Sequence, residues 1–197
     1  MSEKTYIAGG TLLASAPNLR DPNFMHSVTV MCEHSPNGAY GLVINKRSSL
    51  TIDRLLSDHP VLGKLALPVA WGGPVHSDTL QILHRFPDRI PGSYRLAEGV
   101  YLGGELEDVA HVLGAPEDPQ DRHGVRFVLG CAGWGEGQLE AELEGGSWVP
   151  LSMQAELVFG MDRGGRDDQE ETWQSALRTL GKQGQDLAAM PPDIGWN

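Results

Sequence analysis

The sequence lacks any long apolar run. No stretch of its 197 residues approaches the roughly 18 consecutive apolar residues that a membrane-spanning helix needs. The N-terminal residues MSEKTY also lack the apolar centre of a secretory signal peptide. We therefore expect a cytoplasmic protein with no membrane partner.

Basic residues are few. The chain has 15 Lys and Arg against 26 Asp and Glu, which gives a formal net charge of -11. Such a charge repels the phosphate backbone of nucleic acids at long range. No basic cluster offsets it, since the nearest candidates are Lys46 with Arg47 and the scattered Arg85, Arg89 and Arg95. We therefore expect no direct nucleic-acid partner.

Cysteine is scarce, and the common catalytic and metal-binding motifs are missing. The two cysteines, Cys32 and Cys131, fall late in predicted buried strands, where a small buried side chain is favoured over a disulfide. The sequence contains no C-x-x-C, H-E-x-x-H or G-x-S-x-G pattern. We therefore expect no cofactor, no metal and no complete catalytic set.

What the sequence does have is a block of short apolar runs near its start. Residues 11–15, 27–32 and 41–46 are rich in Leu, Val and Ile and are bounded by Pro, Asn, Asp or Gly, which predicts three strands. The S-P-N-G segment at residues 35–38 provides a tight turn, so the second and third strands form a β-hairpin. The strand at 27–32 is apolar on both faces, so we expect it to be covered on both sides.

The remaining chain alternates predicted strands with short helices. Apolar runs predict further strands at residues 67–71, 80–86, 94–102, 125–131 and 148–153, with 94–102 either one strand or two short ones interrupted at residues 98–99. Capping residues and helical periodicity predict helices that begin near residues 51, 105, 138 and 168. A polar loop is predicted at 117–124. No repeat or linker divides the chain, so we expect residues 1–197 to form a single domain with a loosely held tail from about residue 182.

Three motifs closely resemble the YqgE/AlgH family of bacterial proteins. They are LASAPNLRDPNFMHSV with CEHSPNGAYGLVIN at residues 13–28 and 32–45, WGGPV at 71–75 leading to Leu83-His84, and LGCAGWGEGQLEAEL at 129–143. The resemblance implies an α+β fold with a mostly antiparallel, barrel-like sheet flanked by several short helices. The family carries a transcriptional-regulator label and no characterised activity, so the resemblance implies no reaction.

Six residues in or near these motifs are candidates for a ligand or partner surface. They lie where strands end or turn, and the hypothesis is that their loops converge at one end of the sheet: Asp21, His34, Asn45, Gly73, His84 and Trp134. The simpler alternatives are structural histidines held by hydrogen bonds and Asp and Asn side chains that bond local backbone amides. The glycines at 133–137 invite a phosphate loop, but their spacing and Glu136 favour a turn that packs Trp134.

Binding without catalysis is the function that these patterns favour. The motifs are rich in Gly, Pro and Trp but hold no complete catalytic set, so we expect a regulator that binds an unknown protein or a small ligand. The first alternative is a hydrolase with a Cys-His pair or a metal-bound water, built from Cys32, His34, His84 and Cys131. The second is direct DNA binding, which the net charge of -11 resists. The sequence carries no signal for oligomeric state.

Overall fold

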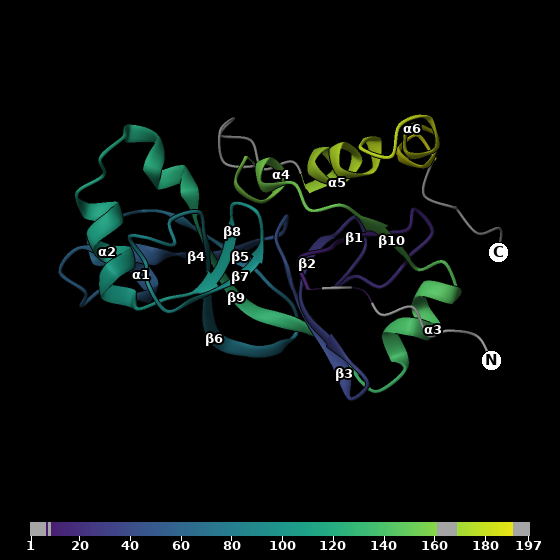
Figure 1. Ribbon diagram of the computed structural model, residues 1–197, viewed down its shortest axis with the longest axis horizontal. Helices are drawn as coiled ribbons and strands as arrows, with labels where there is room; N and C mark the ends of the chain where they lie inside the picture. Colours follow the sequence, from purple (N-terminus) through teal and green to yellow (C-terminus); the bar gives the residue numbers. More distant parts are fainter. Residues whose placement is uncertain (1–6, 8, 161–168, 191–197) are drawn as a thin grey trace.

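The computed structural model describes residues 7, 9–160 and 169–190. These residues form a single ten-stranded sheet that curls into a half-barrel with helices around it (Figure 1). The strand order is β10-β1-β2-β3-β9-β6-β8-β7, and β4 and β5 form a branch beside β9. Every pairing is antiparallel except that of β5 with β9. The predicted α+β fold with a mostly antiparallel, barrel-like sheet is confirmed. The strands are β1 (Leu12–Ser15), β2 (Val28–Ser35), β3 (Gly38–Val43), β4 (Arg47–Thr51), β5 (Pro68–Trp71), β6 (Val75–His84), β7 (Ser93–Ala97), β8 (Val100–Gly103), β9 (Val125–Trp134) and β10 (Trp148–Leu151).

Helices cover the ends and one side of the sheet (Figure 1). They are α1 (Ile52–Leu55), α2 (Leu106–Gly114), α3 (Gln138–Glu144), α4 (Ala155–Phe159), α5 (Gln169–Arg178) and α6 (Lys182–Ala188), with two 3-10 helices, η1 (Leu62–Lys64) and η2 (Pro119–Gly124). Among the residues that the structure describes, no helix combines the length and the apolar character that crossing a bilayer requires.

The predicted hairpin is the pair β2 and β3. Its register runs from Thr29 opposite Val43 to Ser35 opposite Gly38, so the turn lies at the S-P-N-G segment as predicted. The first half of β2 is buried on both faces, which confirms that this strand lies inside the molecule. A β-bulge between Met31 and Glu33 shifts the register at Cys32, and such a bulge re-aims the side chains that follow it.

Strand β9 joins the two halves of the sheet. Its first part pairs with β6 on one edge and with β5 on the other, and its last residues pair with β3. Strand β5 leaves β9 at a sharp turn, where Gly73 has a φ of +146°. A Cβ atom at Gly73 would overlap the backbone of Cys131. The glycine therefore permits the close approach of two backbones where the two halves meet.

Three apolar clusters fill the space between the sheet and the helices. The cluster under α4 and α5 buries Phe159 and Trp173. The cluster beside α1 and α2 buries Val109 and Phe127, and the cluster beneath α3 buries Leu139. Each helix is thus held by its apolar face, which is the expected source of stability for helices this short.

Several elements differ from the sequence prediction. The sequence predicts that residues 48–51 cap α1. In the structure they also form most of strand β4, which runs directly into that helix. The loop expected at 117–124 contains η2, and α4 is an element that the pattern did not predict. Both α4 and η2 are too short to show helical periodicity, which needs a window of about 11–18 residues.

The loosely held tail predicted from about residue 182 is wrong for the residues of α6. Gly184 and Ala188 in this helix are buried, and a Cβ atom at Gly184 would overlap the carbonyl oxygen of Leu177 in α5. The glycine therefore allows α6 to pack closely against α5, although glycine lowers helix propensity. Residues 191–197, and residue 168 at the predicted start of α5, lie outside the described residues.

Candidate functional site

The six predicted site residues do not gather at one end of the sheet. His84 in β6 lies opposite Val125, the first residue of β9, whereas Trp134 is the last residue of β9. At about 3.3 Å per residue, these two ends of β9 are roughly 30 Å apart along the strand. The expected convergence is therefore wrong for His84 and Trp134, and the six residues fall into separate groups.

Trp134 belongs to an aromatic cluster beneath α3. Its Nε1 donates a hydrogen bond to Glu142 Oε2 at 2.9 Å, and Trp148 Nε1 donates to the same oxygen at 2.7 Å. Phe24 stacks on Trp134 and meets Trp148 edge to face. Both indoles are buried, so this carboxylate satisfies two indole donors that would otherwise be costly to bury. The predicted alternative, a turn that packs Trp134, agrees with this arrangement.

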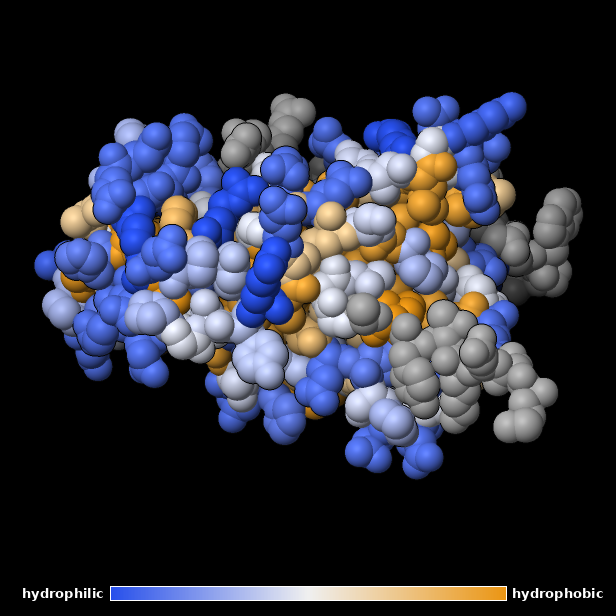
Figure 2. Space-filling model, in the orientation of Figure 1, coloured by the Kyte–Doolittle hydropathy of each residue, from blue (hydrophilic) through white to orange (hydrophobic). Residues whose placement is uncertain are grey.

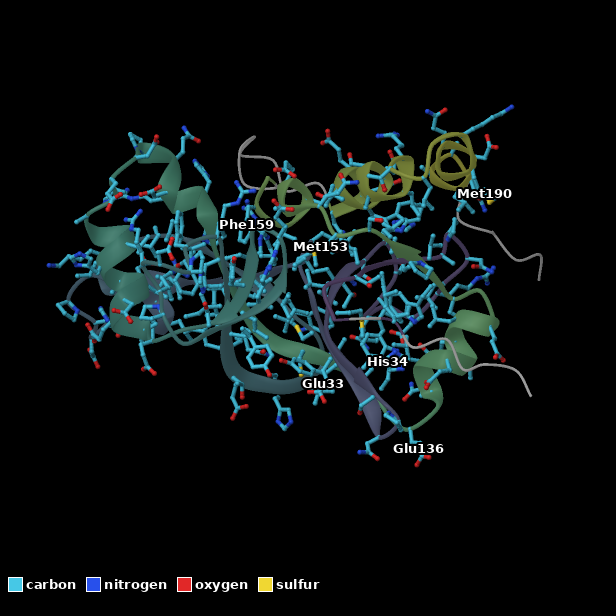
Figure 3. The ribbon with its side chains drawn as sticks, in the orientation of Figure 1. Glu33, His34, Glu136, Met153, Phe159 and Met190 are labelled. Atoms are coloured by element: carbon cyan, nitrogen blue, oxygen red, sulfur yellow. The ribbon has the colours of Figure 1, made fainter. Side chains whose placement is uncertain are left out.

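His34 also contacts α3, but through a different carboxylate. The backbone N–H of Ile7 donates to His34 Nδ1 at 2.9 Å, and His34 Nε2 lies 3.3 Å from Glu140 Oε1. Since Nδ1 accepts a hydrogen bond, the neutral ring carries its proton on Nε2, which faces the carboxylate. The imidazole is 1% exposed and lies beside α3 (Figure 3). It braces residue 7 and the helix against β2.

Asp21 and Asn45 hold backbone segments in place. Asp21 Oδ1 accepts from the N–H of Asn23 at 2.8 Å. Asn45 Oδ1 accepts from the N–H of Val28 at 2.7 Å, and its Nδ2 donates to His26 O at 2.8 Å and to Gln169 O at 2.9 Å. The predicted bonding of a local amide is thus present for Asp21. The partners of Asn45 are 17, 19 and 124 residues away, so this side chain joins distant segments, including the start of α5.

The thiols and imidazoles do not form a nucleophile pair. Burial raises the pKa of the Cys32 thiol to about 12, with a smaller opposing effect from its hydrogen bond with Tyr40. Burial also raises the pKa of Cys131. Cys32 packs against the α4–α5 cluster, whereas His34 contacts Glu140. Within the described residues, no group of three or more His, Cys, Asp and Glu side chains is placed to hold a metal ion.

His84 lies apart from these groups and is fully buried. Its Nδ1 accepts from the backbone N–H of Phe86 at 3.1 Å, and its ring stacks on Tyr101. Desolvation lowers the pKa of His84 to about 4, so the ring is neutral at physiological pH. His84 is therefore a structural histidine held by a hydrogen bond, which is the simpler of the two alternatives that the sequence offers.

A different region offers a pocket for a ligand. It has a volume of about 360 Å³ and lies where the paired strands β4 and β5 meet η2 and the start of β9. We call it the basic pocket, and its lining residues are Arg47, Thr51, Ala66, Leu67, Pro68, Pro119, Arg122, His123, Val125 and Phe127. The apolar side chains come mainly from β9 and the segment before β5, and the basic side chains come from β4 and η2.

The local structure of η2 positions two of the basic side chains. Asp118 caps this helix by accepting from the N–H of Gln120 at 2.7 Å, and Pro119 follows at its first turn. Asp121 Oδ2 binds Arg89 Nη1 at 2.7 Å, and this hydrogen bond is the main reason why the pKa of Asp121 is lowered. The carboxylate is thus engaged by Arg89, while the next two residues, 122 and 123, line the pocket.

Arg122 and His123 have unused hydrogen-bonding capacity. Neither side chain has a hydrogen bond, ion pair or ring contact with another described residue. The Thr51 hydroxyl, also at the pocket, makes no capping bond to α1. An unpaired guanidinium beside an apolar surface is a suitable partner for a carboxylate or phosphate. The basic pocket can therefore hold a small anion by charge and shape.

Sequence reasoning missed the basic pocket because its residues are distant in the chain. Arg47 was noted only as half of a weak basic pair, and residues 122 and 123 fell in a predicted exposed loop. The pocket depends on the parallel pairing of β5 with β9, which brings the paired strands β4 and β5 beside η2. No short motif carries that information.

Comparison with known proteins adds the following similarities. Residues 12–185 match a family model described as AlgH-like. The UPF0301 protein of Chlorobaculum tepidum is 35% identical over 188 residues, which cover 95% of each chain. The UPF0301 protein of Thioalkalivibrio sulfidiphilus is 36% identical over 186 residues, or 93% of each chain.

Two solved structures are similar along nearly their whole length. The solution structure of the AlgH protein from Pseudomonas aeruginosa has a TM-score of 0.68 and 28% identity, and the match covers 100% of this chain and 99% of that one. The crystal structure of a Corynebacterium diphtheriae protein has a TM-score of 0.73 and 22% identity, covering 96% of this chain and 95% of that one.

Proposed function

This chain belongs to the AlgH-like family, and we propose that it binds a small anionic ligand with an apolar part in the basic pocket. In this proposal the protein works in the cytoplasm as a ligand-responsive regulator and not as an enzyme. The observation that carries the proposal is the pair of adjacent basic residues, Arg122 and His123, that line the pocket without a partner among the described residues.

The charge of the pocket favours a small anion over a large one. Two guanidinium groups and an imidazole line it, and no carboxylate does. An arginine holds a carboxylate or phosphate through two parallel N–H···O bonds. The chain as a whole carries a net charge of -11, so it repels an extended polyanion such as DNA, while a local group of cations attracts a compact ligand.

The apolar lining favours a ligand that is more than an inorganic ion. Leu67, Pro68, Val125 and Phe127 contribute aliphatic and aromatic surface. The volume of about 360 Å³ falls at the lower end of the roughly 300–1,000 Å³ that is usual for small-molecule sites. A carboxylate or phosphate joined to a short hydrocarbon or ring fits both the charge and the size.

The side chains that line the basic pocket support ligand binding without a catalysed reaction. Its lining contains no thiol and no carboxylate, so a nucleophile with an adjacent general base is not assembled there. The Cys-His form of the hydrolase alternative would use Cys32 or Cys131, and burial raises the pKa of both thiols, that of Cys32 to about 12. A thiol in that state is not an effective nucleophile at neutral pH.

The test is a titration with hexanoate, a carboxylate on a short apolar chain, followed by amide chemical shifts in NMR spectra. We expect shifts concentrated on the residues of the basic pocket. Arg122→Gln removes a charged hydrogen-bond donor and should weaken hexanoate binding roughly tenfold. Hexanol, which has the same apolar chain without the charge, should bind more weakly than hexanoate.

The matched control is Arg178→Gln on α5. Arg178 donates to Gln174 on its own helix at 2.9 Å and does not line the pocket, so this variant should bind hexanoate like the unmodified protein. Equal weakening in both variants, or equal binding of hexanol and hexanoate, would contradict the proposal. Circular dichroism checks that each variant is folded.

A further inference from the structure

A second pocket adjoins the basic pocket and shares one residue with it. It has a volume of about 370 Å³ and lies between the segment around η1 and the end of α2. We call it the α2 pocket, and its lining residues are Pro60, Val61, Lys64, Leu65, Ala110, His111, Gly114, Ala115 and Arg122. Arg122 is therefore common to both pockets.

The α2 pocket repeats the chemistry of the basic pocket. Lys64 ends η1 and His111 lies in the last turn of α2, and both are exposed at the pocket. Neither side chain has a hydrogen bond or ion pair with another described residue. Val61, Leu65 and the alanines provide apolar walls. Hydrophilic side chains dominate the surface at this end of the molecule, which carries α1 and α2 (Figure 2).

Carboxylates near these cations are paired with other basic groups. Asp121 binds Arg89 at 2.7 Å, and Glu117 lies 3.7 Å from the same arginine. Glu107, on the first turn of α2, lies 3.4 Å from His59. Arg122, His123, Lys64 and His111, which have no partner among the described residues, are therefore left to attract an anion from solution.

Two adjoining pockets of similar size, each with basic side chains and an apolar wall, fit a ligand with two charged ends. We infer that the ligand carries two anionic groups joined by an apolar spacer, one group in each pocket, with Arg122 between them. A guanidinium has five N–H donors in a planar fork, so Arg122 can contact both groups. This inference rests on the proposed function, because it requires that the basic pocket binds an anion.

The test compares α,ω-dicarboxylates from glutarate to sebacate with monocarboxylates of the same chain length. Because the second charge binds as part of the same molecule, the dicarboxylate of matching length should bind roughly tenfold or more tightly than its monocarboxylate. Its NMR shifts should extend from the basic pocket to Lys64 and Gly114. A second series compares α,ω-bisphosphates with alkyl monophosphates and shows whether the anionic groups are carboxylates or phosphates. A tenfold higher affinity of the doubly charged ligand in either series supports the inference.

The variant Lys64→Gln/His111→Gln separates the two proposals. It should abolish the advantage of the doubly charged ligand and leave monocarboxylate binding unchanged, whereas Arg122→Gln should weaken both. Lys182→Gln on α6 is the matched control and should change neither. If no doubly charged ligand in either series binds better than its singly charged partner, or if the advantage survives Lys64→Gln/His111→Gln, the inference fails while the proposed function stands. If monocarboxylates do not bind at all, the proposed function fails.

Discussion

At the residue scale, the distinctive polar side chains of this protein join backbone segments to one another. His34 accepts from Ile7 N–H and faces Glu140, and Asn45 bonds three backbone groups. Trp134 shares Glu142 with Trp148. The residue types and their positions at strand ends indicated such structural roles. The partners lay up to 124 positions away, so no local pattern could have identified them.

His84 should make the stability of the protein depend on pH. Its buried ring has a pKa of about 4, below the ordinary value of 6.5, so between these values the unfolded chain binds a proton that the folded protein excludes. As the pH falls through this range, the free energy of unfolding should therefore decrease, by up to about 1.4 kcal/mol per pH unit from this group. Above pH 6.5 His84 does not contribute to the pH dependence of the free energy of unfolding.

Urea denaturation across this pH range measures the effect. In His84→Gln the free energy of unfolding should depend less steeply on pH than in the unmodified protein. The variant should also be less stable at neutral pH, because the glutamine side chain does not fill the buried site in the same way. Carboxylates that titrate in the same range are present in both proteins and cancel in the comparison. Parallel pH curves would show that His84 binds a proton as readily in the folded protein as in the unfolded chain, which would contradict the lowered pKa.

The two cysteines should be unreactive in the native protein. Burial raises the pKa of both thiols, that of Cys32 to about 12, so the thiolate fraction is very small at neutral pH. Alkylation by iodoacetamide should be at least about a hundredfold slower in native protein than in urea. Mass spectrometry of the two peptides measures each rate. Labelling of native Cys32 as fast as in urea would return the Cys-His hydrolase to consideration.

At the element scale, α5 is attached to the sheet by a small number of directed contacts. Trp173 Nε1 donates to Ser15 O at 2.7 Å, and the Trp173 ring stacks on His26 at 4.4 Å. Asn45 Nδ2 donates to Gln169 O at the start of the same helix. The apolar stripe of α5 predicted its buried face, whereas these contacts to β1 and to the β1–β2 connection could be seen only in the structure.

Removing the Asn45 amide should destabilise the docking of α5. In Asn45→Ala, the N–H of Val28 and the carbonyl of Gln169 lose their side-chain partner in a largely buried place, and the carbonyl of His26 keeps only its bond from Gln169 Nε2. This loss should cost about 3 kcal/mol of unfolding free energy. Urea denaturation measures this loss. Asn18→Ala, at an exposed position, is the control and should stay within about 0.5 kcal/mol of the unmodified protein. Similar losses in both variants would contradict the role given to Asn45.

The elements that sequence patterns missed are short or polar. Strand β4 has a serine pair at its centre and pairs only with β5, so it shows neither strong β propensity nor a buried run. Helix α6 contains Gly184, which discourages a helix prediction although contact with α5 requires it. In both cases a tertiary contact outweighs the local preference of the sequence.

At the scale of the whole molecule, the candidate site depends on which strands are neighbours. The strands themselves were largely predicted from apolar runs and turns, and the family motifs implied their barrel-like arrangement. The basic pocket requires β5 to lie parallel to β9 and η2 to precede β9 directly. Neither motif spacing nor periodicity determines strand order, so the three basic residues of the pocket could not be grouped before the structure was known.

The position of β9 in the sheet has a consequence for synthesis of the protein on the ribosome. Strands β3, β5 and β6 all pair with β9, which begins at residue 125, and β1 pairs with β10 at residues 148–151. A nascent chain that ends before these residues exposes several unpaired strand edges, which are prone to aggregate. These strand edges can pair only after residues 125–151 have left the exit tunnel.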